Sequence, residues 1–233
     1  MLRVSHIVNS VFTSRTYILS KEGENACWIV DCGDVEPLLE RLAALGGIPV
    51  KGVLLTHAHF DHIYGLPRLA ELFPDVRVYT NEAGLKALQD PRLNMSKYHD
   101  DPIVFGPDRV ALCDEGDRVE LFDGVAADVF STPGHHPSCL TFDVGGYLFT
   151  GDAYIPGIAV VTTLPGADKA LAAASRERIL ALAAGRAVCP GHEVAGLPEG
   201  SATGSLAPTR SPTPAASPRP SSWRSCRWPP PAC

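Results

Sequence analysis

Thr56-His57-Ala58-His59-Phe60-Asp61-His62 is the most informative stretch of this 233-residue sequence. It places three histidines and one aspartate within six positions, directly after the apolar run Val53-Leu54-Leu55. An uninterrupted apolar run is typical of a strand that is buried on both faces. Core packing does not explain imidazole and carboxylate groups gathered at the end of such a strand, whereas binding of Zn, Fe or Mn does. The stretch therefore predicts a metal centre at the end of an interior strand.

Three further segments end predicted strands, and each places one histidine or aspartate directly after a glycine. They are Thr132-Pro133-Gly134-His135, Thr150-Gly151-Asp152 and Pro190-Gly191-His192. Glycine allows the backbone to turn sharply and to approach a site closely. Each segment is a weak signal alone, but the four motifs in this order predict one shared site.

Strand-like and helix-like segments alternate along the chain. Short β-rich runs cover residues 2–8, 16–20, 26–30, 51–56 and 76–80, and a second group covers 110–112, 118–122, 127–131, 138–142, 147–150 and 187–189. Apolar residues recur at helical spacing after Asp34, Asn81 and Asp168, which we expect to be N-cap residues. We expect residues 90–108, with three prolines, to form a surface excursion that is a wall or lid of a site. Two strand-rich groups with flanking helices predict an α/β fold of two packed sheets with helices outside.

Composition changes abruptly near residue 197. The segment 197–233 holds nine of the 21 prolines, four arginines and a single acidic residue, Glu199. Removing it leaves 16 basic and 25 acidic residues, so the body carries a net charge of −9 instead of −6. So many prolines are incompatible with helices or central strands. We therefore predict one globular domain over residues 1–196 and a disordered Pro/Ser/Arg-rich tail over 197–233.

The same composition predicts the surroundings of the protein. An acidic body is atypical of nucleic-acid binders, which need clustered Lys and Arg. No run approaches the ~18 consecutive apolar residues of a membrane span. The first residues do not resemble a signal peptide, and the seven cysteines are odd in number and contain no CxxC spacing. We therefore expect a cytoplasmic protein that acts on a small molecule, with no nucleic-acid or membrane partner.

Together, the motifs HAHFDH, TPGH, TGD and PGH resemble those of the metallo-β-lactamase-fold hydrolase superfamily over residues 2–193, in its glyoxalase II-like (hydroxyacylglutathione hydrolase-like) branch. This resemblance implies an αββα sandwich with the site at one edge between the two sheets. It also implies a pair of metal ions. The implied ligands are His57, His59 and His135 for the first ion, Asp61, His62 and His192 for the second, and Asp152 as the bridge between them.

The resemblance also implies a reaction. Two divalent ions, Zn with Fe or Mn as alternatives, would lie ~3.5–4 Å apart and share a hydroxide that attacks a small thioester or ester. Asp61 and Asp152 are the predicted catalytic carboxylates, since their charges partly offset those of the ions. Asp152 stands where the B1 class of zinc β-lactamases has cysteine, which argues against antibiotic hydrolysis. Tyr154, Tyr98 and Lys97 are the predicted substrate contacts.

Two alternatives are left open by the sequence. A mononuclear iron persulfide dioxygenase resembles this family and would use only the equivalents of His57, His135 and Asp152. The other is a non-catalytic product with an aberrant C-terminus, such as a shifted reading frame would make of residues 197–233. The other histidines have simpler expectations: His6 in a strand, His99 on the surface, and His136 at most a neighbour of the ligands.

Overall fold

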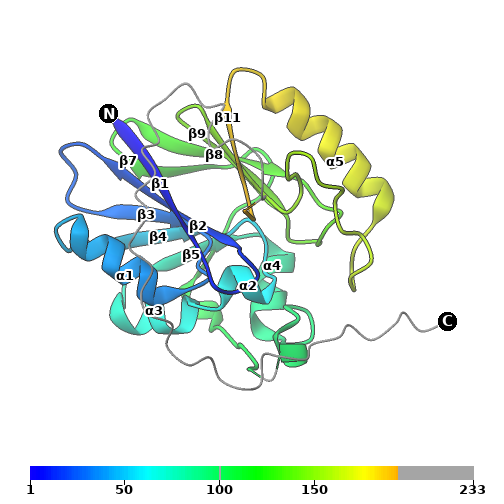
Figure 1. The fold of residues 1–233 in the computed structure, drawn as a ribbon, viewed down its shortest axis with the longest axis horizontal. Coiled ribbons are helices and arrows are strands. Elements are labelled where there is room, and N and C mark those ends of the chain that lie inside the picture. Colours follow the sequence, from blue (N-terminus) through cyan, green and yellow to red (C-terminus); the bar gives the residue numbers. More distant parts are fainter. Residues whose placement is uncertain (100, 194–233) are drawn as a thin grey trace.

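The computed structural model describes residues 1–99 and 101–193, which form two β-sheets packed face to face (Figure 1). The first sheet has the hydrogen-bonded order β1 (Leu2–Val8), β2 (Arg15–Lys21), β3 (Cys27–Val30), β4 (Val50–Leu54), β5 (Arg77–Thr80) and β6 (Val110–Leu112). The second has the order β11 (Ala187–Pro190), β10 (Tyr147–Gly151), β9 (Leu140–Val144), β8 (Val125–Ser131) and β7 (Arg118–Phe122).

Helices cover the outer faces of both sheets. The helices are α1 (Val35–Ala44), α2 (Phe60–Ile63), α3 (Leu66–Leu72), α4 (Glu82–Gln89) and α5 (Lys169–Leu182), with 3-10 turns η1 (Ser96–His99) and η2 (Pro107–Arg109). α1 and α3 lie on the first sheet, where Leu38 and Leu69 pack on Ile29 and Val53. α5 lies on the second sheet, where Ile179 packs on Leu148. This αββα layering confirms the predicted fold class.

The two sheets meet in a continuous apolar layer. Trp28 and Leu54 of the first sheet belong to the same buried cluster as Phe142 and Phe149 of the second. The indole Nε1 of Trp28 also donates to the backbone carbonyl of Leu121, at 2.8 Å. All four residues of β3 are buried, as are the last three of β4, because one face of these strands meets the helices and the other meets the second sheet.

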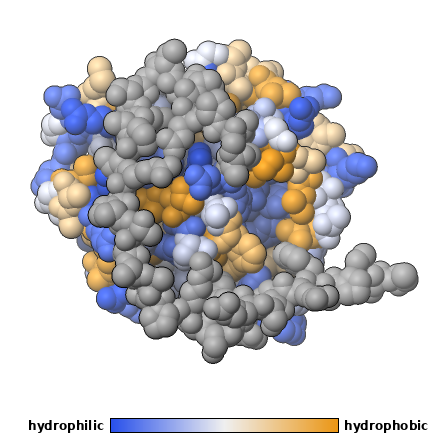
Figure 2. Space-filling view, viewed as in Figure 1, coloured by the Kyte–Doolittle hydropathy of each residue, from blue (hydrophilic) through white to orange (hydrophobic). Residues whose placement is uncertain are grey.

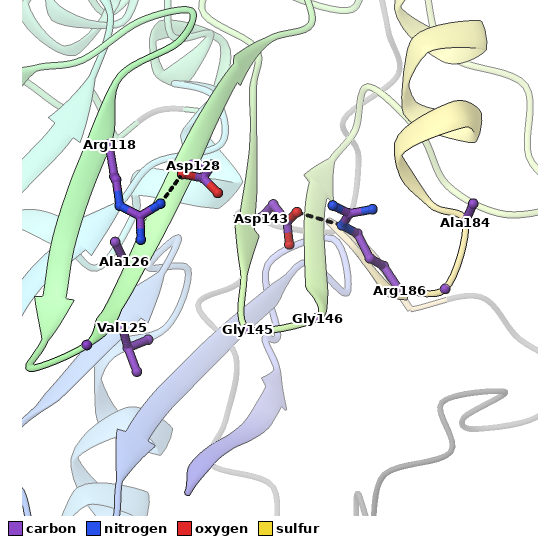
Figure 3. Close-up of a pocket in the computed structure, with 11 residues that line it drawn as sticks. Arg118, Val125, Ala126, Asp128, Asp143, Gly145, Gly146, Ala184 and Arg186 are labelled. Carbon is purple, nitrogen blue, oxygen red and sulfur yellow. Dashed lines mark hydrogen bonds and ion pairs between the residues drawn. The ribbon is translucent and has the colours of Figure 1, made fainter.

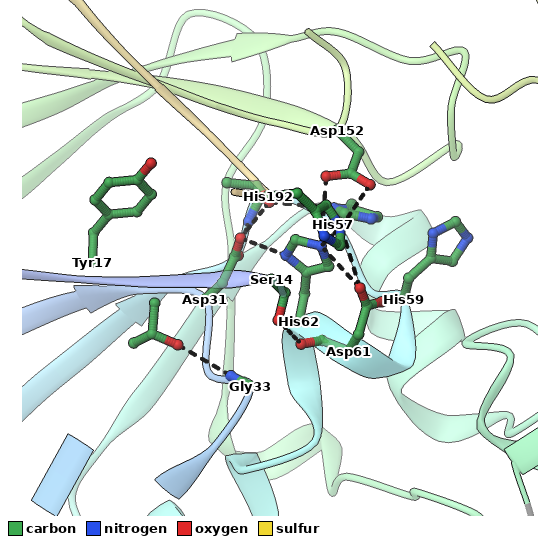
Figure 4. A network of polar contacts seen from close by, with 12 residues as sticks. Ser14, Tyr17, Asp31, Gly33, His57, His59, Asp61, His62, Asp152 and His192 are labelled. Carbon is green, nitrogen blue, oxygen red and sulfur yellow. Dashed lines mark hydrogen bonds and ion pairs between the residues drawn. The ribbon is translucent and has the colours of Figure 1, made fainter. Parts of the chain in front are cut away.

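Strand direction brings the predicted motifs to one edge of the sandwich. β3 runs parallel to β4, and β10 runs parallel to β11. The carboxyl ends of parallel neighbours lie at the same edge of a sheet. The segments that follow β4, β10 and β11 therefore meet where the two sheets come together (Figure 4).

Two local expectations change. Asp34 occupies the N-cap position of α1, but its carboxylate makes no cap hydrogen bond and instead accepts from the backbone N–H of Ser10. Asn81 and Asp168 do cap α4 and α5, as predicted. The helical structure in the described residues of the 90–108 segment is limited to the 3-10 turns η1 and η2. The segment is nevertheless anchored in the core, because Met95, Ile103 and Phe105 are buried in the cluster on the first sheet's outer face.

The predicted tail, residues 197–233, lies outside the described residues, as does the domain boundary at 196. The disorder and frame-shift hypotheses for this segment stay predictions. In the part of the chain that the structure describes, no helix combines the length and hydropathy that crossing a membrane would require.

Candidate metal centre

The loop after β4 and the single turn α2 place the central histidines. His57 and His62 are fully buried, His59 is 5% exposed, and the ring centroids of His57 and His62 are 4.2 Å apart. α2, which was not predicted, turns the chain so that Asp61 and His62 lie on the same side as His57 (Figure 4). One short segment therefore contributes four polar side chains to the site.

The first ligand set consists of three histidines, His57, His59 and His135. Nε2 of His135 lies 3.0 Å from Nδ1 of His59, and Nε2 of His57 is buried with no hydrogen-bond partner among the described residues. Nδ1 of His135 donates to the backbone carbonyl of Val161, at 2.9 Å, so Nε2 is the ring nitrogen that faces the other two histidines. Each of the three rings thus turns one nitrogen toward the other two.

The second set consists of Asp61, His62 and His192. Nε2 of His192 lies 3.3 Å from both Nε2 of His62 and Oδ2 of Asp61. Gly191 is required beside this set, because a Cβ on it would lie 2.2 Å from Oδ1 of Asp152. Glycine here allows the close approach that the sequence motif predicted.

Asp152, directly after β10, lies between the two sets. Its Oδ2 is 3.6 Å from Nε2 of His135 in the first set and 3.2 Å from Nε2 of His192 in the second. Its Oδ1 is 3.6 Å from Nε2 of His62 and has no hydrogen-bond partner among the described residues. One carboxylate therefore touches both sets.

The hydrogen bonds made by Nδ1 of His62 and His192 show which nitrogens of these rings remain for a cation. Nδ1 of His62 donates to Asp31, and Nδ1 of His192 donates to the carbonyl of Phe12, both at 2.9 Å. The two Nε2 lone pairs then face each other at 3.3 Å and repel unless a cation or proton lies between them. Nitrogen ligands of tetrahedral Zn, each about 2.0–2.1 Å from the metal, are about 3.3 Å apart. The donor types and spacing therefore fit metal ions.

The two sets differ in charge. Burial, and then the neighbouring His62, His59 and His135, lower the pKa of His57 well below its usual range, so His57 stays neutral. Burial opposes charge on His192 as well, but hydrogen bonds and charge attraction from Asp152 and Asp61 outweigh it and raise the pKa of His192 to about 11. The carboxylates thus make the second set a place where positive charge is favoured.

Several supporting residues were not predicted from the sequence. Asp31 accepts from Nδ1 of His62 and from both the backbone N–H and the hydroxyl of Thr56, at 2.7 Å each. Ser138 Oγ accepts from the N–H of Ala58, at 3.0 Å. Asp31 had a detectable signal, because it directly follows β3 just as the other motifs follow their strands. Ser138 had none.

The structure brings all seven predicted ligands together in these sets. That they bind metal stays a prediction. His136 is buried, and its ring centroid is 4.7 Å from that of His59, so it is the neighbour that was expected. Burial, followed by the nearby His135, lowers the pKa of His136 to about 4.

The predicted substrate contacts lie near the site in different ways. Tyr154 packs partly buried against the cluster of Ile179 and Leu148, and its carbonyl accepts from Thr150. Lys97 and the half-exposed Tyr98 belong to η1, which lies beside the metal-ligand loop because His99 stacks on Phe60 with ring centroids 3.8 Å apart. That these three residues contact substrate stays a prediction.

A small apolar pocket adjoins the ligands. It has a volume of about 30 Å³ and is lined by His135, Asp152, Ile155, Ile158, Ala159, Val160 and Val161. On the other side of the site, Phe12 is 49% exposed and packs edge-on against Phe60. Figure 2 views the molecule from the same side as Figure 1. It shows two hydrophobic areas with a hydrophilic area between them.

A second cavity, of about 460 Å³, lies along β7–β10 and the end of α5 (Figure 3). Its charged residues are paired with one another, Arg118 with Asp128 and Arg186 with Asp143. It contains none of the seven predicted ligands. This cavity is larger, but its charged side chains already form ion pairs with one another.

Comparison with known proteins identifies one matching family model and several similar proteins. Residues 11–192 match the family described as the Metallo-beta-lactamase superfamily. The chain is similar to hydroxyacylglutathione hydrolase of Aeromonas hydrophila, with 35% identity over 58% of this chain and 45% of the relative. It is likewise 35% identical to that of Xylella fastidiosa strain M12, over 71% and 54%. The chain thus spans about half the length of these curated relatives.

Solved structures agree with the fold. The B3 metallo-beta-lactamase BLEG-1 has a TM-score of 0.73 at 28% identity and covers 82% of this chain and 92% of its own. The protein TTHA1623, solved in a di-iron-bound form, has a TM-score of 0.67 at 31% identity and covers 81% and 92%.

Proposed function

The chain belongs to the metallo-beta-lactamase superfamily, and from this we propose that it hydrolyses a small thioester or ester with a pair of divalent metal ions, as a glyoxalase II-like enzyme. We propose Zn as the metal, with Fe or Mn as alternatives; the di-iron form of TTHA1623 makes Fe worth testing. Curated relatives named hydroxyacylglutathione hydrolase support thioester chemistry.

The observation that carries this proposal is the position of Asp152. Its carboxylate lies within 3.6 Å of nitrogens from both ligand sets, with Oδ2 near His135 and His192 and Oδ1 near His62. A single mononuclear site would not need a shared carboxylate between two complete donor sets. The arrangement therefore supports two ions rather than one.

Bound ions would supply a polarised water as nucleophile and a Lewis acid for the substrate carbonyl. The chain's own residues prepare for this. His57, His59 and His135 present ring nitrogens to the site, and burial lowers the pKa of His57 and of His59 so that these two stay neutral. Asp61 and Asp152 balance part of the added positive charge. Asp31, Phe12 and Val161 accept from the outer nitrogens of three ligands, so that each ring keeps its orientation.

The apolar pocket beside Asp152 supports a proposal for the position of the substrate. Its volume of about 30 Å³ holds only two or three water-sized groups, at roughly 10–15 Å³ each. We propose that a short acyl group lies there against Ile158 and Val161, with the leaving thiol or alcohol directed to the open mouth. The lining includes no Lys or Arg, and five of its seven residues are apolar, so the enclosed part of the site favours an uncharged group.

The experiment is a substrate panel run on protein of known metal content. It compares a hydroxyacyl-glutathione thioester, the same acyl group on a neutral thiol, and the matching oxygen ester. We expect metal-dependent hydrolysis of at least one thioester and loss of that hydrolysis in Asp152→Ala. Exposed Asp123, on the hairpin between β7 and β8, supplies the control Asp123→Ala. Failure of every thioester and ester at full metal content would contradict the proposal.

The same experiment separates the other reactions. One Fe per chain with oxygen consumption would indicate the dioxygenase alternative. A β-lactam belongs in the panel because a structural neighbour is named a B3 metallo-beta-lactamase. No metal binding and no cooperative melting would indicate the non-catalytic alternative. We also propose a small-molecule substrate and a cytoplasmic location, which the five buried free cysteines of the described residues support.

A further inference from the structure

The turn between β1 and β2, residues 9–14, contacts the second ligand set by two routes. The carbonyl of Phe12 accepts from Nδ1 of His192 at 2.9 Å. The hydroxyl of Ser14 donates to the backbone carbonyl of Asp61 at 2.8 Å (Figure 4). Both ligands from opposite sheets are therefore fastened to the same six-residue turn.

Backbone pairing strengthens the link to His192. Ser14 and His192 form an isolated antiparallel bridge. The N–H of Arg15 donates to the carbonyl of Gly191 at 2.7 Å, and the N–H of Glu193 donates to that of Thr13 at 3.0 Å. The segment that carries His192 past the end of β11 is thus held in place by the 9–14 turn.

The turn is itself rigidly built. Asn9 and Ser14 are 2% and 0% exposed, and Nδ2 of Asn9 donates to Oγ of Ser14 at 3.1 Å and to Oγ1 of Thr16 at 3.2 Å. Oδ1 of Asn9 accepts from the N–H of Asp34 at 3.0 Å, which ties the turn to the start of α1. Phe12 and Thr13 have φ of 52° and 56°, which residues other than glycine rarely adopt and which cluster at functional sites.

The first ligand set is anchored elsewhere. Nδ1 of His135 donates to Val161, and the hydroxyl of Ser175 on α5 donates to the carbonyl of Pro133 at 2.6 Å, two residues before His135. Within residues 1–99 and 101–193, no hydrogen bond joins the 9–14 turn to His57, His59 or His135. The 9–14 turn is therefore bonded to ligands of the second set only, whereas Thr56 and Asp31 lie between His57 and His62 and serve both sets.

We propose that residues 9–14 are a positioning element for the second metal ion alone, so that this turn decides whether the site holds one ion or two. The inference rests on the proposed binuclear site. Phe12 and Ser14 act through His192 and Asp61 and are positioning residues. Loosening the turn frees these two ligands while leaving the three histidines of the first set in place.

The test uses the full chain, stripped of metal and titrated with Zn²⁺ against a chromophoric chelator. His59→Ala and Asp61→Ala identify which binding step belongs to which ligand set. Ser14→Ala should raise the Kd of the second Zn²⁺ by about 10–100-fold, the usual cost of losing an outer-shell partner, and leave the first within about twofold. Ser175→Ala is the matched control, because it removes an equivalent hydroxyl donor beside the first set and should leave the second Kd unchanged.

A second pair of variants acts on the exposed backbone of the turn. Thr13→Pro imposes a φ near −65° where the native φ is 56°, and should lose the second Zn²⁺ while retaining the first. Thr13→Gly accommodates the native φ and should keep both. Co²⁺ spectra provide an independent readout, since the two sets have different donors.

The outcomes separate the two proposals. Wild-type protein that binds fewer than two Zn²⁺ contradicts the proposed function. Wild-type protein that binds two, with Ser14→Ala leaving both Kd values unchanged or raising them equally, overturns the role of the turn while the proposed function stands. Thr13→Pro that keeps both ions at wild-type affinity would overturn it as well.

Discussion

The two ligand sets differ in the type of their donor groups and in how far these groups are exposed. The first set has three imidazoles, each at most 5% exposed and carried by loops that leave interior strands. The second includes the carboxylate of Asp61 and His192, whose side chain is 18% exposed and is supported by a strained turn. The comparison teaches that two ligands of the second set, Asp61 and His192, depend on the 9–14 turn, whereas no ligand of the first set is bonded to it within the described residues.

Removing one ligand from each set gives the largest expected effect. His59→Ala and Asp61→Ala should each lower kcat by more than ~100-fold, the upper cost of losing an outer-shell partner. Metal analysis should show that each variant loses one ion, the first in His59→Ala and the second in Asp61→Ala. Loss of both ions in both variants would show that the sets are not separable.

Metal removal tests how much each set contributes to stability. A ligand present at about 100 times its Kd stabilises the folded state by about 2.7 kcal/mol, which shifts Tm by roughly 5–10 °C in a chain of this size. A chelator should therefore lower the Tm of the wild-type protein measured by calorimetry. Asp61→Ala should show a smaller drop, since it has only the first ion to lose. Equal drops would contradict separate sets.

Asp31→Asn probes the outer partner of His62. The amide is nearly isosteric and keeps an acceptor for Thr56, but it no longer holds the proton of His62 with a full negative charge. We expect the Kd of the second ion to rise by about 10–100-fold while the first changes little. Thr132→Val is the control, because it removes a buried hydroxyl that bonds to Thr141 and, among the described residues, to no ligand. It measures the effect of losing a buried polar group as such. A larger rise in the Kd of the first ion than in that of the second would contradict the assignment of Asp31 to the second set.

The smallest expected effect concerns the surface of α5. Arg178 forms two hydrogen bonds with Glu115, at 2.6 and 2.8 Å, and these lower the pKa of Glu115. The pair therefore stabilises the fold above the unfolded Glu pKa of about 4.3, and this contribution is lost as pH falls through the lower folded pKa. Because both groups are exposed, Arg178→Ala should lower the free energy of unfolding at pH 7 by no more than ~1 kcal/mol.

Neither metal Kd should change in Arg178→Ala, although Arg178 also contacts the carbonyl of Ser131 just before the first-set loop. Urea unfolding at pH 7 and pH 3 measures the stability term, which should shrink at the lower pH. A shift in the first Kd would show that the anchoring of the first set reaches the exposed surface of α5.

The sequence was sufficient for the fold and for the seven residues that the structure gathers into the two ligand sets, for identifiable reasons. Continuous apolar runs such as Val53-Leu54-Leu55 do form interior strands, and glycine before His192 does permit a close approach. Parallel neighbours then bring the strand-end motifs to one edge. These features depend on local pattern and on strand direction, both of which the sequence carries.

The supports of the site were not predictable in the same way. Phe12 and Val161 act through backbone carbonyls, which every residue has, so no side-chain pattern marks them. The positive φ of Phe12 and Thr13 is uncommon for these residue types. Without a glycine at either position, the sequence does not indicate it. Asp34 does occupy the N-cap position of α1, but its carboxylate accepts from Ser10 of the 9–14 turn and not from the helix, because tertiary contacts outweighed local preference.

The most direct test is to titrate metal-free protein with Zn²⁺ while following hydrolysis of a short-chain thioester. If Asp152 couples two sets into one catalytic centre, activity should stay low through the first equivalent and rise through the second. Full activity after a single equivalent, or no hydrolysis after two, would contradict the account.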